Sequence, residues 1–294
     1  MYALALLGCT DPLVVERIIG VDIASVVYEG TENARLGASV AYDGRVAATA
    51  PGVGCVELDG EGIPGPSQWV GFVDGEVARA GDGELWLGEA RHDAGTARAF
   101  AAGDTAVFLG GTAGVWTVPG GPVDIAVAAV EALAVDGSRL ATRSRDAGAG
   151  GCRVVLWSLA ETTPSGEEVS IPCSADGALA FVDGALCAGD PELADDVGTG
   201  TVGCDDGRAF RGEPGDHLGR AIGGGYAAGS FNKWLVPGLA RLVPLRGGPL
   251  LALEEGAENQ PHALAGDAGT LVVGAPYYAA GSLPTGAVFV VALP

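Results

Sequence analysis

The chain has 294 residues, 48% of them hydrophobic, with 50 glycines and 17 prolines. This composition indicates a folded, turn-rich chain rather than a low-complexity one. The formal net charge of −21 at pH 7, with Lys233 as the single lysine, makes nucleic acid and anionic lipid unfavourable partners. No apolar run reaches the ~18–20 residues that a membrane-spanning helix needs.

The start of the chain carries a possible lipidation signal. Leu6-Leu7-Gly8-Cys9 resembles a bacterial lipobox, in which the cysteine is lipidated and becomes the mature N-terminus. The resemblance implies that residues 1–9 are the remainder of a signal. Residues 10–294 are then expected to form one domain. Only eight residues precede Cys9 and none is basic, so the alternative is a strand that reads like a lipobox. We expect the lipobox.

Seven degenerate units follow, with a period of about 40 residues, and each pairs short apolar runs across a Gly/Pro turn. They cover residues 36–58, 70–87, 98–118, 133–157, 179–204, 218–244 and 262–291. This repeat predicts an all-β fold, a seven-bladed β-propeller of short antiparallel sheets. A two-sheet sandwich is the alternative, but it gives no reason for a repeat. Residues 123–135 are Ala-rich and helix-prone, a weak contrary signal.

Asp-Gly pairs support this layout. Four units place Asp-Gly between the first and second apolar runs, where a two-residue type I′ turn needs positive φ at both positions. The pairs are Asp43-Gly44, Asp74-Gly75, Asp136-Gly137 and Asp183-Gly184. The seventh unit stops after its third run, so we expect residues 14–19 or 25–28 to supply the missing strand and close the ring.

The tail phrase Gly269-Thr-Leu-Val-Val-Gly-Ala-Pro276, followed by Gly286-Ala-Val-Phe-Val-Val291, resembles the FG-GAP repeat of the integrin alpha-subunit head and of many bacterial surface proteins. In that family the first-to-second strand loop often carries an Asp-x-Asp-x-Asp-Gly calcium site. Here the loop is cut to Asp-Gly or to Gly223-Gly224-Gly225, and one carboxylate cannot supply six to eight oxygen ligands. We therefore predict no metal site and no cofactor.

The six cysteines predict disulfides. Cys187 and Cys204 lie symmetrically about a loop of the fifth unit, and Cys152 and Cys173 flank a predicted hairpin, so each pair can form a bridge between neighbouring strands. Two such bridges indicate an oxidising, extracytoplasmic compartment. Cys55 is a free buried thiol if Cys9 is lipidated; otherwise Cys9 and Cys55 form a third bridge. The sequence contains no Cys-x-x-Cys pair, so zinc binding by these cysteines is not expected.

Other motifs for chemistry are weak. Gly198-Thr-Gly-Thr-Val-Gly203 matches a dinucleotide fingerprint but enters a predicted strand rather than a helix, so we interpret it as loop glycines. His92, His217 and His262 fall in three different units and are interpreted as solvated loop residues. Pairs of adjacent carboxylates are interpreted as a solvated acidic rim; they are Asp195-Asp196, Asp205-Asp206 and Glu254-Glu255.

Long second-to-third strand loops in the last three units give the best candidate site. They span residues 189–196, 229–237 and 275–284 and bring together aromatic and charged residues. The predicted binding residues are Asp195, Asp196, Phe231, Lys233, Trp234, Tyr277 and Tyr278. Rigid aromatic side chains are good anchors for protein or sugar surfaces. The alternative is that the rings cap their loops and pack inward.

These observations predict a non-enzymatic binding or structural module, monomeric and at the cell surface or secreted, whose partner is an unknown protein or polysaccharide. Contact with a membrane is expected only through a lipid at Cys9. The alternative is a propeller-based lyase or glycosidase with its site in the central funnel. Positions nearest the axis read as Ala, Val, Leu, Gly and Ser, which argues against catalysis.

Overall fold

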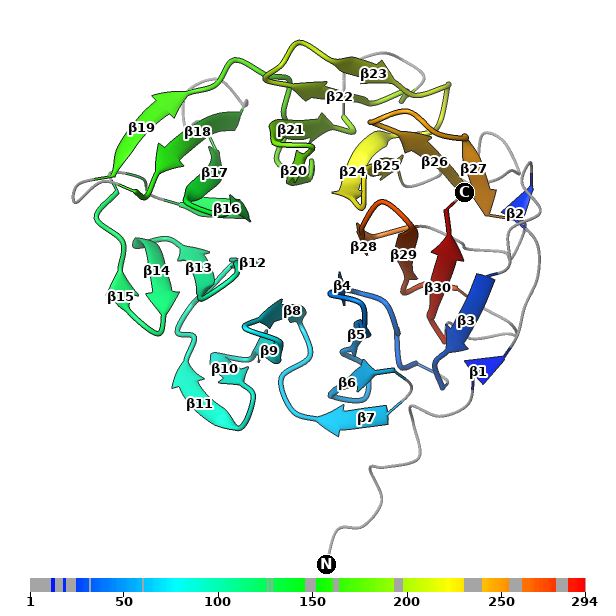
Figure 1. The fold of residues 1–294 in the computed structure, drawn as a ribbon, viewed down its shortest axis with the longest axis horizontal. Coiled ribbons are helices and arrows are strands. Elements are labelled where there is room, and N and C mark those ends of the chain that lie inside the picture. Colours follow the sequence, from blue (N-terminus) through cyan, green and yellow to red (C-terminus); the bar gives the residue numbers. More distant parts are fainter. Residues whose placement is uncertain are drawn as a thin grey trace, which may run out of the picture.

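The computed structural model describes residues 12–13, 18–19, 25–31, 33–59, 61–125, 127, 129–145, 152–160, 164–192, 198–229, 240–253, 261–278 and 285–293. The described chain is all β, and Figure 1 shows seven small antiparallel sheets arranged in a ring. The predicted seven-bladed β-propeller is therefore confirmed. The helix-prone residues 123–135 contain no described helix, and they lead instead into β16 (Val130–Asp136).

Each of the first five blades is a four-stranded meander whose strands pair in chain order. Blade 1 contains β4 (Val40–Tyr42), β5 (Val46–Ala50), β6 (Cys55–Leu58) and β7 (Glu61–Pro64). Blade 2 contains β8 (Trp69–Val73), β9 (Glu76–Gly81), β10 (Glu84–Leu87) and β11 (Ala90–Asp93). Blade 3 contains β12 (Ala99–Ala102), β13 (Val107–Gly111), β14 (Gly114–Val118) and β15 (Gly121–Pro122). Blade 4 contains β16, β17 (Arg139–Arg145), β18 (Cys152–Ser158) and β19 (Ser165–Glu168). Blade 5 contains β20 (Leu179–Val182), β21 (Ala185–Asp190), β22 (Thr201–Cys204) and β23 (Ala209–Arg211).

The last two blades also take in strands from the start of the chain. Blade 6 contains β24 (Leu218–Gly223), β25 (Tyr226–Gly229), β26 (Ala240–Pro244) and β27 (Leu251–Leu253), and β2 (Ile18–Ile19) pairs with β27. Blade 7 contains β28 (Ala263–Gly266), β29 (Thr270–Ala275) and β30 (Ala287–Ala292). β3 (Ser25–Glu29) pairs antiparallel with β30, and β1 (Pro12–Leu13) pairs with β3. The predicted closure by an N-terminal strand is therefore confirmed, with β3 as the closing strand (Figure 1).

Two of the four Asp-Gly pairs form the predicted two-residue turn. Asp74-Gly75 and Asp183-Gly184 have positive φ at both residues and lie between directly paired neighbours. The other two expectations are wrong in detail. At Asp43 the turn holds three residues, because Tyr42 pairs with Val46. Asp136 itself pairs with Arg139, so that turn is Gly137-Ser138. Position in the ladder, as well as the dipeptide, decides the turn type.

In the described part of the chain, seven apolar clusters hold the ring together, one between each pair of neighbouring blades. The cluster between blades 6 and 7 is the largest and includes Leu242, Leu271 and Phe289. The cluster between blades 7 and 1, around Leu36 and Val288, joins the two ends of the chain. The remaining five clusters join blades 1–2, 2–3, 3–4, 4–5 and 5–6. The core is thus distributed around the ring rather than gathered at one centre.

Both predicted disulfides are present. Cys187 and Cys204 are directly opposite each other on β21 and β22, with Cα atoms 4.1 Å apart. Cys152 and Cys173 also form a bridge, with Cα atoms 5.9 Å apart. Cys55 is disulfide-bonded as well, so of the two alternatives for this residue the free thiol is excluded. Cys9 and its predicted lipidation lie outside the described residues.

Candidate functional site

The meander topology gives the ring two different faces. The turn face carries the hairpin turns that join first to second and third to fourth strands, including residues 43–45, 74–75, 183–184, 206–208, 224–225 and 245–248. The first strand of each blade lies nearest the centre of the ring and is called its inner strand (Figure 1). The loop face carries the ends of the second strands and the links that precede the inner strands, including residues 34–36, 143–145, 174–178, 216–217, 261–262 and 276–278. The predicted binding loops belong to the loop face.

Arginines on the turn face connect neighbouring blades. Arg45 donates to the Gly75 carbonyl at 2.6 Å, from blade 1 to blade 2. Arg139 repeats this contact from blade 4 to the Gly184 carbonyl of blade 5 at 2.7 Å. Both guanidinium groups also lie over an aromatic ring of the next inner strand, within 5 Å of its centroid. Charge-assisted hydrogen bonds and cation–π contacts together make these arginines structural.

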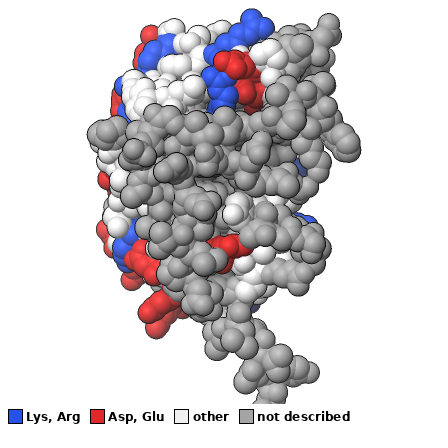
Figure 2. All heavy atoms as spheres, turned by 90° about the vertical axis from the view of Figure 1, so that its right-hand side faces the viewer, with Lys and Arg blue, Asp and Glu red and all other residues white. Residues whose placement is uncertain are grey.

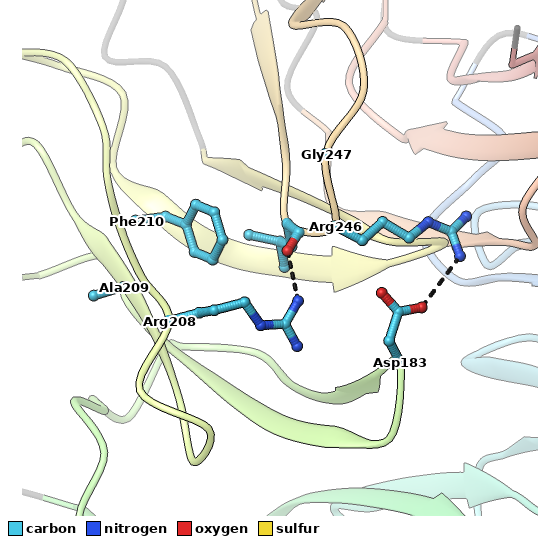
Figure 3. Close-up of a pocket in the computed structure, with 7 residues that line it drawn as sticks. Asp183, Arg208, Ala209, Phe210, Arg246 and Gly247 are labelled. Carbon is cyan, nitrogen blue, oxygen red and sulfur yellow. Dashed lines mark hydrogen bonds and ion pairs between the residues drawn. The ribbon is translucent and has the colours of Figure 1, made fainter.

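A cavity of about 490 Å³ opens on the turn face between blades 5 and 6 (Figure 3). It is lined by Asp183, Arg208, Ala209, Phe210, Leu245, Arg246 and Gly247. Its two arginines are already engaged. Arg208 donates to the Leu245 carbonyl at 2.6 Å, and Arg246 donates to the Asp267 carbonyl of blade 7 and lies 3.7 Å from the Asp183 carboxylate. Because these donors bind protein carbonyls and a carboxylate, the cavity is better explained as an inter-blade joint than as a ligand site.

The loop face differs, because polar atoms there are buried without a partner. Among the described residues, six buried side-chain atoms have no hydrogen-bond partner, and all lie toward the loop face of blades 4 to 7. They are Glu131 Oε2, Arg143 Nε and Nη1, Ser174 Oγ, Arg220 Nε and His262 Nε2. Buried polar atoms are normally paired, so each of these needs an explanation. Unused hydrogen-bonding capacity is thus concentrated on the face that carries the predicted binding loops.

Two of these residues correct the expectation of purely apolar and small residues at the axis. Arg220 lies on the inner strand β24, and Glu131 lies on the inner strand β16 at a β-bulge between Val130 and Ala132. A bulge re-aims the side chain of the extra residue. Glu131 pairs with Arg145 at 3.4 Å. Both charged residues stand in runs that otherwise read as apolar.

Five of the predicted binding residues, Asp195, Asp196, Phe231, Lys233 and Trp234, lie outside the described residues. The other two are adjacent but differ in environment. Tyr278 packs edge-on against Phe289 at 5.8 Å between ring centroids, next to the cluster between blades 6 and 7, as in the inward-packed alternative. The neighbouring Tyr277 is 37% exposed. Tyr277 is therefore the described residue that suits an anchor.

Tyr277 is at the centre of a loop-face cluster, here defined as Arg35, Arg220, His262 and Tyr277. The rings of Tyr277 and His262 meet edge-to-face at 5.1 Å, and the Arg35 guanidinium lies 5.9 Å from the Tyr277 ring centroid. Burial, with the nearby positive charge of Arg220, lowers the pKa of His262 to about 4. His262 is therefore neutral at pH 7 and not the solvated residue expected from its isolated position. Sequence reasoning missed Arg35 and Arg220 because neither belongs to a motif.

Among the described residues that Figure 2 shows, charges of both signs are mixed. Figure 2 shows Lys/Arg and Asp/Glu side chains next to one another in its upper and lower parts. Within the described ranges, no group of three or more His, Cys, Asp or Glu side chains could hold a metal ion. A search of the same residues for a helix long and apolar enough to span a membrane found none.

The fold defines this chain as a seven-bladed β-propeller. Solved structures agree: virginiamycin B lyase from Staphylococcus aureus is similar with a TM-score of 0.59 and 11% identity, over 93% of this chain and 100% of that chain. The computationally designed Ika8 protein is similar with a TM-score of 0.52 and 16% identity, over 97% and 96% of the two chains. At these identities the likeness shows the fold alone. No protein-family model matches the chain, and neither does any curated protein.

Proposed function

We propose that this protein is a non-enzymatic, extracytoplasmic binding module that presents its loop face to a protein or glycan. The contrast between the faces carries this proposal. On the turn face, Arg45 and Arg139 donate hydrogen bonds to carbonyls of the next blade. The loop face instead combines an exposed Tyr277 with buried donors that have no protein partner. Rigid aromatic anchors next to polar groups that can be satisfied by a ligand are typical of recognition sites.

The ionisable groups of the described inner strands favour binding over a glycosidase site in the central funnel. A glycosidase needs two carboxyl groups about 5–10 Å apart, one on each side of the scissile bond. On the described inner strands, the two ionisable residues nearest the loop face are Glu131 and Arg220, which lie on blades 4 and 6 with blade 5 between them. Glu131 is already paired with Arg145. We therefore place recognition, rather than bond cleavage, at this face.

Tyr277→Ala tests the proposal. An array of immobilised glycans and extracellular proteins would first identify what the wild-type protein binds. We expect Tyr277→Ala to weaken that binding by about tenfold or more, because an aromatic anchor typically contributes ~2 kcal/mol at an interface. Because Tyr277 is partly exposed, the variant should keep the melting temperature of the wild type.

Phe210→Ala is the matched control, since it removes an aromatic ring from the cavity on the turn face. We expect it to leave binding unchanged. Loss of binding in Phe210→Ala with retention in Tyr277→Ala would move the site to the turn face and refute the proposal. Thermal unfolding of both variants would show that any loss of binding is local.

We further propose that the protein acts in an oxidising compartment and that Cys9 is bridged to Cys55. A cysteine sulfur cannot carry both a thioether lipid and a disulfide, and Cys9 is the one cysteine left once the four paired residues and Cys55 are counted. Mass spectrometry of unreduced native protein should therefore yield a peptide that links Cys9 to Cys55. A diacylated or triacylated Cys9 would instead establish the lipoprotein, and six free thiols would contradict the extracytoplasmic location.

A further inference from the structure

The loop-face cluster gathers positive charge on a strongly acidic protein. Its members come from three consecutive blades: Arg220 from β24 of blade 6, His262 and Tyr277 from the two sides of the β28–β29 hairpin of blade 7, and Arg35 from the link before blade 1. In the described part of the chain, neither arginine forms an ion pair. This contrasts with Arg45, Arg139 and Arg246, each of which has a carboxylate within 4 Å.

The unsatisfied atoms define which chemical group would suit the cluster. Arg220 Nε is buried and can only donate a hydrogen bond, since a guanidinium has no acceptor. His262 Nε2 is also buried without a partner, and the neutral ring can carry its proton on that nitrogen. With the proton on Nε2, His262 adds a second donor to that of Arg220, whose charge already acts on its ring. Such donors need an acceptor, and a carboxylate is the acceptor that an arginine pairs with most strongly.

The cluster also offers a surface for the rest of such a ligand. Tyr277 is 37% exposed, and its ring lies between the Arg35 guanidinium and the His262 imidazole. An aromatic ring with an apolar body and a polar tip can contact the C–H groups of a pyranose while neighbouring donors hold its polar substituents. A sugar acid combines both features in one small ring.

We propose that the loop-face cluster binds the carboxylate of a uronic acid residue in a glycan. In this arrangement Arg220 binds the carboxylate, His262 Nε2 donates to the same group or to a neighbouring hydroxyl, Tyr277 contacts the ring and Arg35 adds positive charge at the rim. The inference rests on the proposed function and names the ligand class of that same face. It is limited to isolated carboxylates, because the net charge of −21 opposes a densely charged polyanion.

The test uses two probes that differ in charge and by one methyl group: methyl β-D-glucuronoside and its methyl ester. Titrations followed by ligand-observed NMR would give a dissociation constant for each. We expect the wild-type full chain to bind the acid at least tenfold more tightly than the ester. Arg220→Gln should abolish this preference, and Arg35→Gln should reduce it in part, since Arg35 is exposed and lies at the rim.

Arg91→Gln is the matched control because it removes the same charge from the outer strand of blade 2. Arg91 is 64% exposed there, and Glu84 is the one ion-pair partner it has among the residues that the structure describes. It should leave the preference intact. Equal binding of acid and ester by the wild type, or an unchanged preference in both Arg220→Gln and Arg35→Gln, would overturn the inference. If neither sugar binds while another ligand still depends on Tyr277, the uronate inference fails and the proposed binding function stands.

Discussion

Gly219→Ala is expected to destabilise the propeller by about 3 kcal/mol. Gly219 has φ +105°, and an added Cβ would lie 2.6 Å from the Thr201 carbonyl oxygen and 2.7 Å from the Gly189 Cα of blade 5. The positive φ costs an L-residue roughly 1–2 kcal/mol, and forcing an atom against backbone costs roughly 1–3 kcal/mol more. Backbone cannot rotate away as a side chain can, so blades 5 and 6 would have to separate locally. Urea denaturation of the variant and wild type would measure this loss.

Gly207→Ala is the matched control. Gly207 has a similar φ of +89°, but its added Cβ would meet no atom within 4 Å. It should therefore show the backbone cost alone, about 1–2 kcal/mol. If Gly219→Ala were no more destabilising than Gly207→Ala, the close approach of blades 5 and 6 at Gly219 would add nothing to the cost of the positive φ, and the prediction would be wrong.

The same local structure occurs at the junction of the chain ends. Leu218 makes a parallel bridge with Gly200 of blade 5, and Leu36 makes the equivalent bridge with Gly286 of blade 7. Each leucine precedes a glycine with positive φ whose added Cβ would strike a glycine of the preceding blade. The Leu-Gly phrases therefore mark a close approach of two blades. At these positions the packing between blades explains why the sequence keeps glycine.

The fold was predictable because its determinants are local and repeated. Short alternating runs, hairpin turns and the unpaired third strand of blade 7 together require seven sheets and a closing strand. The turn type was less predictable. Asp136-Gly137 looks like Asp74-Gly75 in sequence, yet Asp136 pairs with Arg139 and remains in the ladder. The β16–β17 ladder also shifts register between Val130 and Ala132, and the dipeptide alone does not encode such a shift.

The candidate site was predictable only in part, because it depends on contacts between blades. The choice of the loop face followed from loop length, and Tyr277 was among the predicted residues. Tyr278 has the same side chain, but its ring packs edge-to-face against Phe289, next to the core. Arg220 is the most informative case: it stands in an apolar run, and its importance comes from His262, which is on another blade. No spacing along the chain relates these two residues.

Replacement of both Cys187 and Cys204 by alanine is expected to lower the free energy of unfolding by about 3 kcal/mol or more. The bridge joins positions 17 residues apart and so restricts the unfolded chain, which contributes roughly 3 kcal/mol for a loop of this size. Both cysteines are also buried, at 0% and 5% exposure, in the cluster between blades 5 and 6, so alanine leaves a gap there. Urea denaturation without reductant would measure the effect.

The second bridge separates these two contributions. Cys152 and Cys173 are 21 residues apart, so replacing both by alanine should remove a similar constraint on the unfolded chain. Both residues are only half-buried, so the packing loss should be smaller and the total destabilisation less than for Cys187 and Cys204. Reductant should bring the wild type toward the stability of the two variants. A wild type whose unfolding midpoint is insensitive to reductant, or a Cys187/Cys204 variant that loses less than the Cys152/Cys173 variant, would contradict this account of the fifth blade.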